Sequence, residues 1–174
     1  AVCNFPDWNP SHFLDVGEMA MAVAIGYDWL FDELSEETKA KAREAINQHA
    51  FGHTDEAKYC KFYIARNNWN QVCNGGLVAA SLATYESNPE IAGKLIMDAV
   101  ESNMEPLKAM YGPDGNYVEG YSYWDYMRDM IKQIVIHNIC KANKIQNGIY
   151  QISCNEYKQH FEQLDLDKIL QIQN

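Results

Sequence analysis

The amino-acid sequence predicts an all-α fold built from successive antiparallel helix pairs. Apolar residues recur three and four positions apart over several long stretches, which is the spacing of an amphipathic helix. No run of alternating apolar and polar residues is long enough to predict a sheet. The chain has 174 residues, of which 47% are hydrophobic and 22% are charged, as in an ordinary globular protein. We therefore expect residues 1–174 to form a single helical domain with its own core.

The first helix pair is predicted between residues 13 and 50. Apolar residues from Phe13 to Leu34 follow the helical spacing, and a second apolar face indicates that this helix is buried on two sides. That second face consists of Met21, Ile25 and Trp29. Ser35 then has the position of an N-cap for the next helix, which begins "EETKAKAREA". Its basic residues predict a solvated face, made of Lys39, Lys41 and Arg43.

A second helix pair follows a polar connector over residues 51–66. The segment "NWNQVCNGGLVAASLATYES" predicts a helix whose Gly75 and Gly76 permit another helix to approach closely. Its partner lies in "SNPEIAGKLIMDAVESNMEPLKAMYG", with Asn88 as N-cap and Pro89 at the first helical position. The expected buried face of that partner comprises Ile91, Leu95 and Ala99.

The stretch "GPDGNYVEG" is rich in turn residues and predicts a break in the helices. Residues 121–139 after it predict a helix with an apolar face, made of Trp124, Met127, Met130, Ile131, Ile134 and Val135. A last helix is expected over residues 155–171.

Charge and composition exclude several classes of function. The net charge is −10, and no strip of lysine and arginine is present, so we expect no nucleic-acid partner. Acidic residues interrupt the longest apolar stretch, residues 19–34, so no membrane span is predicted. The first residues, "AVCNFPDWNP", do not form a signal-peptide pattern. The five cysteines lack the spacing of a disulfide framework and are expected to be mostly buried free thiols.

One pair of histidines has the spacing of metal ligands. His49 and His53 would lie side by side on a helix, but Gly52 weakens a helix there and no HExxH motif is present. Further ligands would have to come from Asp55, Glu56 and Cys60. We expect neither a metal nor another cofactor.

Two predicted helix starts carry unusual polar and aromatic residues, "NNWNQ" and "GNYVEGYSYWDY". Alternate loops of an antiparallel stack lie at the same end, so both helix starts would line one cleft. The same spacing also fits surface loops with helix caps and packed aromatic rings. The second segment supplies phenol groups and flat rings, from Tyr117, Tyr121, Tyr123, Trp124 and Tyr126. Nearby carboxylates would suit glycoside hydrolysis if two of them lay about 5–10 Å apart; they are Asp114, Glu119 and Asp125.

Three segments resemble heparinase II/III-like polysaccharide lyases in their order and spacing. They are "WNPSHFLDVGEMAMAVAIGYDWLFDELSEET", "NNWNQVCNGG" and "GPDGNYVEGYSYW", and the likeness covers residues 8–136. The resemblance implies helix pairs that form part of an incomplete (α/α) toroid. It also implies a bacterial, periplasmic or secreted protein that cleaves an acidic, uronate-containing polysaccharide by β-elimination.

The resemblance gives roles to individual residues. Asn68 would neutralise the uronate carboxylate, while Tyr123, or else Tyr121, would transfer the proton. Substrate-binding roles fall to Asn67, Trp69, His12, Glu119 and Trp124.

Residues 137–174 diverge from the family pattern, and we expect this chain to be a partial toroid without the β-sandwich domain that the resemblance implies. We therefore expect little or no lyase activity. The apolar faces of Met19, Val23, Tyr27 and the 127–134 stripe would be covered either by a second copy in a homodimer or by the last helix, packed differently from the family. Two other functions stay open. One is a glycoside hydrolase that uses Glu119 or Asp125 with a second acid, and the other is a non-catalytic helical module that binds carbohydrate or protein.

Overall fold

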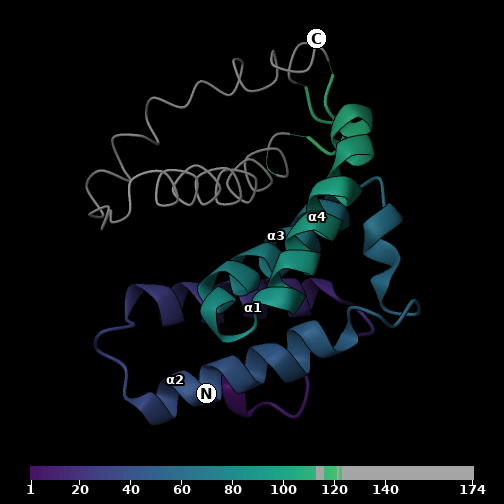
Figure 1. Cartoon of the computed structure of the whole chain (residues 1–174). Helices are drawn as coiled ribbons and strands as arrows, with labels where there is room; N and C mark the ends of the chain where they lie inside the picture. Colours follow the sequence, from purple (N-terminus) through teal and green to yellow (C-terminus); the bar gives the residue numbers. More distant parts are fainter. Residues whose placement is uncertain (113–115, 121, 123–174) are drawn as a thin grey trace, which may run out of the picture. The chain divides into compact units, whose positions relative to one another are not determined.

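Four α-helices make up most of the described chain (Figure 1), which in this computed structural model comprises residues 1–112, 116–120 and 122. The helices are α1 (Leu14–Trp29), α2 (Glu36–Ala45), α3 (Asn68–Ala83) and α4 (Pro89–Met110). Short helical turns connect them: η1 (Val2–Asn4), η2 (Ile46–Ala50), η3 (Phe51–His53), η4 (Cys60–Ile64) and η5 (Tyr85–Ser87). Within the described ranges there is no β-strand, only one antiparallel bridge between Tyr111 and Tyr117. The all-α prediction is confirmed.

Helices α1 and α2 form an antiparallel pair. The guanidinium of Arg43 donates a hydrogen bond to the Tyr27 hydroxyl at 3.0 Å, and the chain beyond α2 returns toward the N-terminal segment, where the rings of His49 and Trp8 meet. Ser35 caps α2, because its hydroxyl accepts from the backbone N–H of Thr38. The predicted N-cap is therefore confirmed.

Two expectations for this pair are wrong. Helix α1 ends at Trp29 rather than near Leu34, and the Trp29 side chain is 74% exposed instead of forming part of a buried face. Lys39 is buried rather than solvated: its ammonium pairs with Glu36 at 2.8 Å and lies 4.1 Å from the centre of the Phe31 ring. The turn that follows α1 brings Phe31 against Lys39 of α2, which explains the burial of Lys39.

The segment between the two helix pairs is more ordered and more apolar than its sequence indicates. Residues 51–66 were expected to be a polar connector, yet they contain η3 and η4, and both Phe51 and Phe62 are buried. Both rings pack among buried residues of α1 and α3, so this segment belongs to the core.

Helices α3 and α4 also form an antiparallel pair. Gln71 near the start of α3 contacts Met110 at the end of α4, while Leu82 near the end of α3 packs with Ala99. Pro89 occupies the first turn of α4 as predicted. Asn88 stands at the N-cap position, but its side chain makes no capping hydrogen bond.

The buried face of α4 differs from the prediction at one position. Leu95 and Ala99 are buried as expected, whereas Ile91 is exposed and Ala92 is buried in its place. The face therefore begins one residue later than the pattern suggested.

Helices α1 and α3 approach each other so closely that glycine is required. A Cβ atom on Gly76 would lie 2.1 Å from the Gly17 carbonyl oxygen, and one on Gly17 would lie 3.1 Å from the Cys73 Cα. The predicted close approach is confirmed at Gly76. The contact sets the spacing of the two helices whose first turns carry the candidate site.

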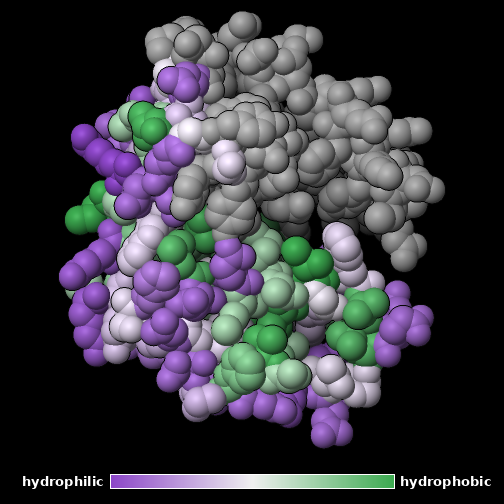
Figure 2. Space-filling model, turned by 180° about the vertical axis from the view of Figure 1, so that it is seen from behind, coloured by the Kyte–Doolittle hydropathy of each residue, from purple (hydrophilic) through white to green (hydrophobic). Residues whose placement is uncertain are grey.

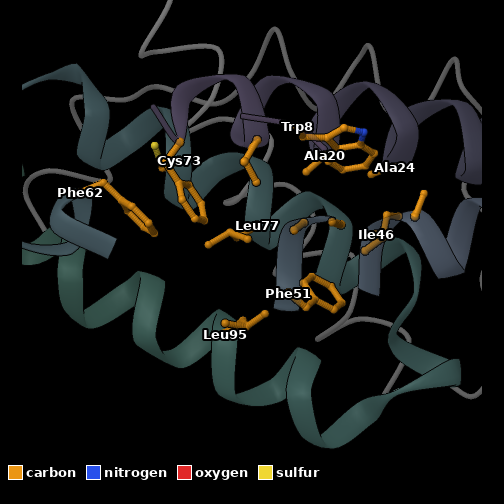
Figure 3. Close-up of a cluster of buried hydrophobic side chains, with 14 residues drawn as sticks. Trp8, Ala20, Ala24, Ile46, Phe51, Phe62, Cys73, Leu77 and Leu95 are labelled. Carbon is orange, nitrogen blue, oxygen red and sulfur yellow. The ribbon is translucent and has the colours of Figure 1, made fainter. Parts of the chain in front are cut away.

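The main core lies between α1, α3, η2 and the connector. Figure 3 shows Trp8, Phe51, Phe62 and Leu77 converging from different segments on this core. A second cluster joins three helices to the segment after α4 through Met21, Val72, Met110 and Tyr117. This second cluster holds the segment after α4 against the helices.

The apolar faces expected to lie uncovered are partly covered. Tyr27 is buried, and Met19 and Val23 pack against the main core as half-buried side chains. Figure 2 shows hydrophobic residues gathered on one face and bordered by hydrophilic ones. The exposed apolar side chains of α4 are Ile91, Met97, Val100 and Met104. Of the helices expected over residues 121–139 and 155–171, only residue 122 is described, and it is helical; the 127–134 stripe lies outside the described ranges.

Candidate functional site

The asparagines that open α3 have separate structural roles. Asn67 is the N-cap: its backbone is extended, and its side-chain oxygen accepts from the backbone N–H of Trp69 at 3.2 Å. This contact satisfies one of the amides that a helix start leaves without an intrahelical partner. Asn67 thus orders the first turn, on which Asn68 and Trp69 stand.

Asn68 binds a carboxylate from a distant part of the chain. Its side-chain Nδ2 donates to Glu119 Oε1 at 2.9 Å, and its backbone N–H donates to Glu119 Oε2 at 3.0 Å. The two residues are 51 positions apart. Both carboxylate oxygens are therefore engaged by one asparagine at the positive end of a helix, which favours negative charge.

Tyr117 is the third member of this group, and its hydroxyl donates to Glu119 Oε2 at 2.8 Å. The Tyr117 ring packs on Tyr111, next to the bridge between the same two residues. Burial and the hydrogen bond to Glu119 raise the pKa of the Tyr117 phenol above its ordinary value. Tyr117 is thus a hydrogen-bond donor near neutral pH and is unsuited to act as a base.

His12 and Trp69 come together beside this group. Their ring centres are 5.1 Å apart, with the rings almost perpendicular. His12 Nδ1 lies 2.8 Å from Asp15 Oδ2, which also accepts from the Asn9 side chain at 2.8 Å. With its proton on Nδ1 the imidazole donates to Asp15, and Nε2 is then left as an acceptor.

The backbone around His12 is strained. Asn9 and Phe13 have positive φ angles of 55° and 32°, which side chains other than glycine rarely adopt. Phe13 is held there by its buried ring, which stacks on Phe62 at 4.5 Å between centres. The connector therefore helps to fix the turn that presents His12.

The start of α1 adds negative charge to this surface. Burial, and then the nearby charge of Asp15, raise the pKa of the Glu18 carboxyl above its ordinary value. An anionic ligand would therefore need local hydrogen-bond donors, and Asn68 supplies two of them.

A buried polar cluster lies beneath the first turns of α3. The side-chain Nδ2 of Asn70 donates to Ser102 Oγ at 2.8 Å and to the Phe62 carbonyl at 3.0 Å. Asn74 donates to the same Ser102 hydroxyl at 3.0 Å, and that hydroxyl donates to the Tyr63 carbonyl at 2.8 Å. The cluster links α3 to α4 and to η4.

Sequence reasoning missed this cluster. The signal was present, because asparagine is unfavourable inside a helix and Asn70 and Asn74 fall on the same face as buried apolar residues. Buried amides of this kind need partners, and Ser102 provides one for both.

The residues weighed as metal ligands make other contacts, some of them with one another. The His49 ring packs on Trp8, while His53 Nδ1 lies 2.8 Å from Glu56. The Cys60 thiol donates to the His53 carbonyl at 3.2 Å, and burial raises the pKa of that thiol to about 11. Among the residues that the structure describes, no group of three or more side chains is arranged to hold a metal ion.

The structure brings together five of the predicted site residues: His12, Asn67, Asn68, Trp69 and Glu119. Tyr121, Tyr123 and Trp124 lie outside the described ranges, as do Asp114 and Asp125. The two segments expected to line one cleft do meet, at Asn68 and Glu119. Tyr117, which touches Glu119, had been considered only as one of several phenols.

No protein-family model matches this chain, and no curated protein matches it significantly. None of the described helices is long and apolar enough to cross a membrane. The lyase resemblance therefore stays a prediction.

Proposed function

We propose that this chain is a polysaccharide lyase-like domain that binds a uronate-containing polysaccharide at the start of α3. The supporting observation is the contact between Asn68 and Glu119, in which one asparagine engages both oxygens of a carboxylate. A uronate carries the same functional group. Asn68 is therefore suited to receive the carboxylate of an acidic sugar.

The chemistry of β-elimination makes this contact useful beyond binding. The reaction removes the proton next to the uronate carboxylate and expels the 4-linked sugar, and negative charge spreads onto the carboxylate as the proton leaves. Hydrogen-bond donors already in place lower the energy of that charged state. The amide of Asn68 donates without having to be protonated first.

The remaining roles follow from the surroundings of Asn68. The edge-to-face pair of His12 and Trp69 offers a sugar ring a flat face and a polar edge. Transfer of the proton is proposed for Tyr123 or Tyr121, since the hydroxyl of Tyr117 is tied to Glu119. The proposed partner is an acidic polysaccharide, and the proposed location is periplasmic or secreted.

A glycoside hydrolase is the second candidate, because Glu119 lies in the site. Its carboxylate, however, accepts three hydrogen bonds, from Asn68 twice and from Tyr117. A general acid must direct a proton at the leaving-group oxygen, whereas both oxygens of Glu119 already accept hydrogen bonds within the protein. The arrangement thus suits a carboxylate acceptor better than a proton donor.

The test measures binding of alginate and heparan sulfate oligosaccharides to the chain by calorimetry, together with their cleavage. We expect Asn68→Ala to weaken binding about tenfold or more when it is compared in a Glu119→Ala background, where no side chain already occupies the amide, since a charge-assisted hydrogen bond contributes about 1.5–3 kcal/mol. Asn88→Ala is the matched control, because Asn88 also begins a helix but makes no capping hydrogen bond. Equal binding by Glu119→Ala and Asn68→Ala/Glu119→Ala would contradict the proposal.

The products separate the candidate functions. A lyase creates an unsaturated sugar that absorbs near-ultraviolet light, a hydrolase creates new reducing ends without that absorbance, and a binding module creates neither. New reducing ends without absorbance would replace the lyase proposal with the hydrolase.

A further inference from the structure

The hydrogen-bond donors with which Asn68 would bind a uronate carboxylate are already occupied by Glu119 of the same chain. We infer that Glu119 is an internal competitor, which an anionic ligand must displace before it reaches Asn68. This inference rests on the proposed function for the identity of the ligand, a uronate. It changes the role of Glu119 from a substrate-binding residue to one that regulates access to the site.

Competition follows from the geometry of the contact. Glu119 uses the backbone N–H of Asn68 and one of the two hydrogens of its side-chain amide. A uronate carboxylate placed on those donors would meet a second carboxylate at the same point, and two like charges in direct contact repel. The two anions therefore cannot occupy this pair of donors at the same time.

Attachment to the chain gives Glu119 an advantage over a free ligand. A tethered group acts at an effective concentration that reaches the millimolar range for short flexible connections. The tether here is short, because Tyr117 is buried in the second cluster only two residues before Glu119. A single uronate should thus bind weakly, while a longer oligosaccharide gains further contacts that help it to displace Glu119.

The surroundings of Glu119 also allow it to leave. Its side chain is exposed, the neighbouring Val118 is 68% exposed, and Gly120 has a φ of 88° with open space around its Cα. Rotation of the Glu119 side chain into solvent frees Asn68 without unpacking Tyr117. Tyr117 can then donate its hydroxyl hydrogen to the incoming ligand instead.

Removal of the competitor should raise the affinity of the site. The apparent dissociation constant equals the intrinsic constant divided by the fraction of molecules with a free receptor. If Glu119 occupies Asn68 in about nine molecules of ten or more, its loss tightens binding at least about tenfold. If Glu119 instead bound the ligand directly, Glu119→Ala would weaken binding.

The test compares wild type, Glu119→Ala and Glu119→Gln for binding of an alginate tetrasaccharide by calorimetry. We expect Glu119→Ala to bind at least about tenfold more tightly than wild type, with Glu119→Gln in between because its neutral amide oxygen is a weaker acceptor. Glu37→Ala is the matched control, since it removes an equal charge from an exposed position on α2 and should leave binding unchanged. The double variant Asn68→Ala/Glu119→Ala should bind no better than Asn68→Ala.

Equal or weaker binding by Glu119→Ala would overturn the inference and leave the proposed function standing. A second ligand, acetate, tests the internal competitor independently of the proposed function. Acetate, titrated against the Asn68 side-chain amide by NMR at constant ionic strength, should shift that signal in Glu119→Ala but not in wild type. If acetate does so while no variant binds the tetrasaccharide, the internal competitor is supported and the proposed function is wrong. If neither probe binds Glu119→Ala, both are wrong.

Discussion

Asn68 and Glu119 are joined by two hydrogen bonds, of 2.9 and 3.0 Å, across 51 positions of sequence. The contact links the start of α3 to the segment that follows α4. It therefore joins the two parts of the chain that were predicted from the sequence to line one cleft.

The contact between Asn68 and Glu119 should contribute to the free energy of unfolding. We expect a double-mutant cycle of Asn68→Ala and Glu119→Ala to give a coupling free energy of about 0.5–1 kcal/mol, in the lower part of the usual range because Glu119 is exposed to water. Urea denaturation of the four proteins supplies the measurement. Additive effects of the two substitutions would show that the contact does not form in solution.

The contact of α1 with α3 predicts a much larger effect. Gly76→Ala places a methyl group 2.1 Å from the Gly17 carbonyl oxygen, so the helices must separate, and we expect a loss of about 3 kcal/mol or more. Gly93→Ala is the control, because a Cβ there meets nothing within 4 Å and alanine stabilises a helix interior by about 0.5–1 kcal/mol. Thermal melting of both variants checks that Gly76→Ala lowers the melting temperature and that Gly93→Ala raises it. A Gly76→Ala protein as stable as wild type would contradict the close approach.

The buried amide cluster predicts that the asparagines of α3 are not equivalent. Asn70→Ala leaves the Phe62 carbonyl without its side-chain donor and removes one of the two amide donors to the Ser102 hydroxyl, so we expect a loss of about 2–3 kcal/mol in the free energy of unfolding. Asn67→Ala removes only an exposed cap, which is worth about 1 kcal/mol. Denaturant unfolding of the two variants measures the difference. Equal losses would show that the cluster contributes no more than a helix cap.

Local signals in the sequence predicted much of the fold. Ser35 caps the helix that follows it directly in sequence, so the cap could be predicted without a structure. Gly75 and Gly76 predict a close helix approach whichever element packs against them. Lys39 and Trp29 were misjudged, because their burial depends on where α1 ends and how the turn after it places Phe31. That turn is a tertiary feature, which helical periodicity does not contain.

The sequence predicted several residues of the candidate site, but it did not predict which of them contact one another. Asn68, Trp69 and His12 could be selected from motifs, whereas the contact of Asn68 with Glu119 depends on the path of the chain after α4. The partner of Asn70 and Asn74 is Ser102, an ordinary residue in the middle of α4. No pattern around Ser102 distinguishes it from other serines.

The exposed side of α4 bears on the expected dimer. Met97, Val100 and Met104 are exposed at spacings that place them along one side of the helix. We expect light scattering to detect a dimer, and Val100→Glu to shift it toward monomer because a buried unpaired charge is costly. A wild-type chain that is monomeric at all concentrations would contradict this expectation.

The central claim is that Asn68 receives a uronate carboxylate. A crystal structure of Glu119→Ala with a bound alginate tetrasaccharide tests it most directly. The account predicts a sugar carboxylate within hydrogen-bonding distance of both the Asn68 side-chain amide and its backbone N–H, with a sugar ring against Trp69. A tetrasaccharide bound elsewhere, or one whose carboxylates all point away from Asn68, would contradict it.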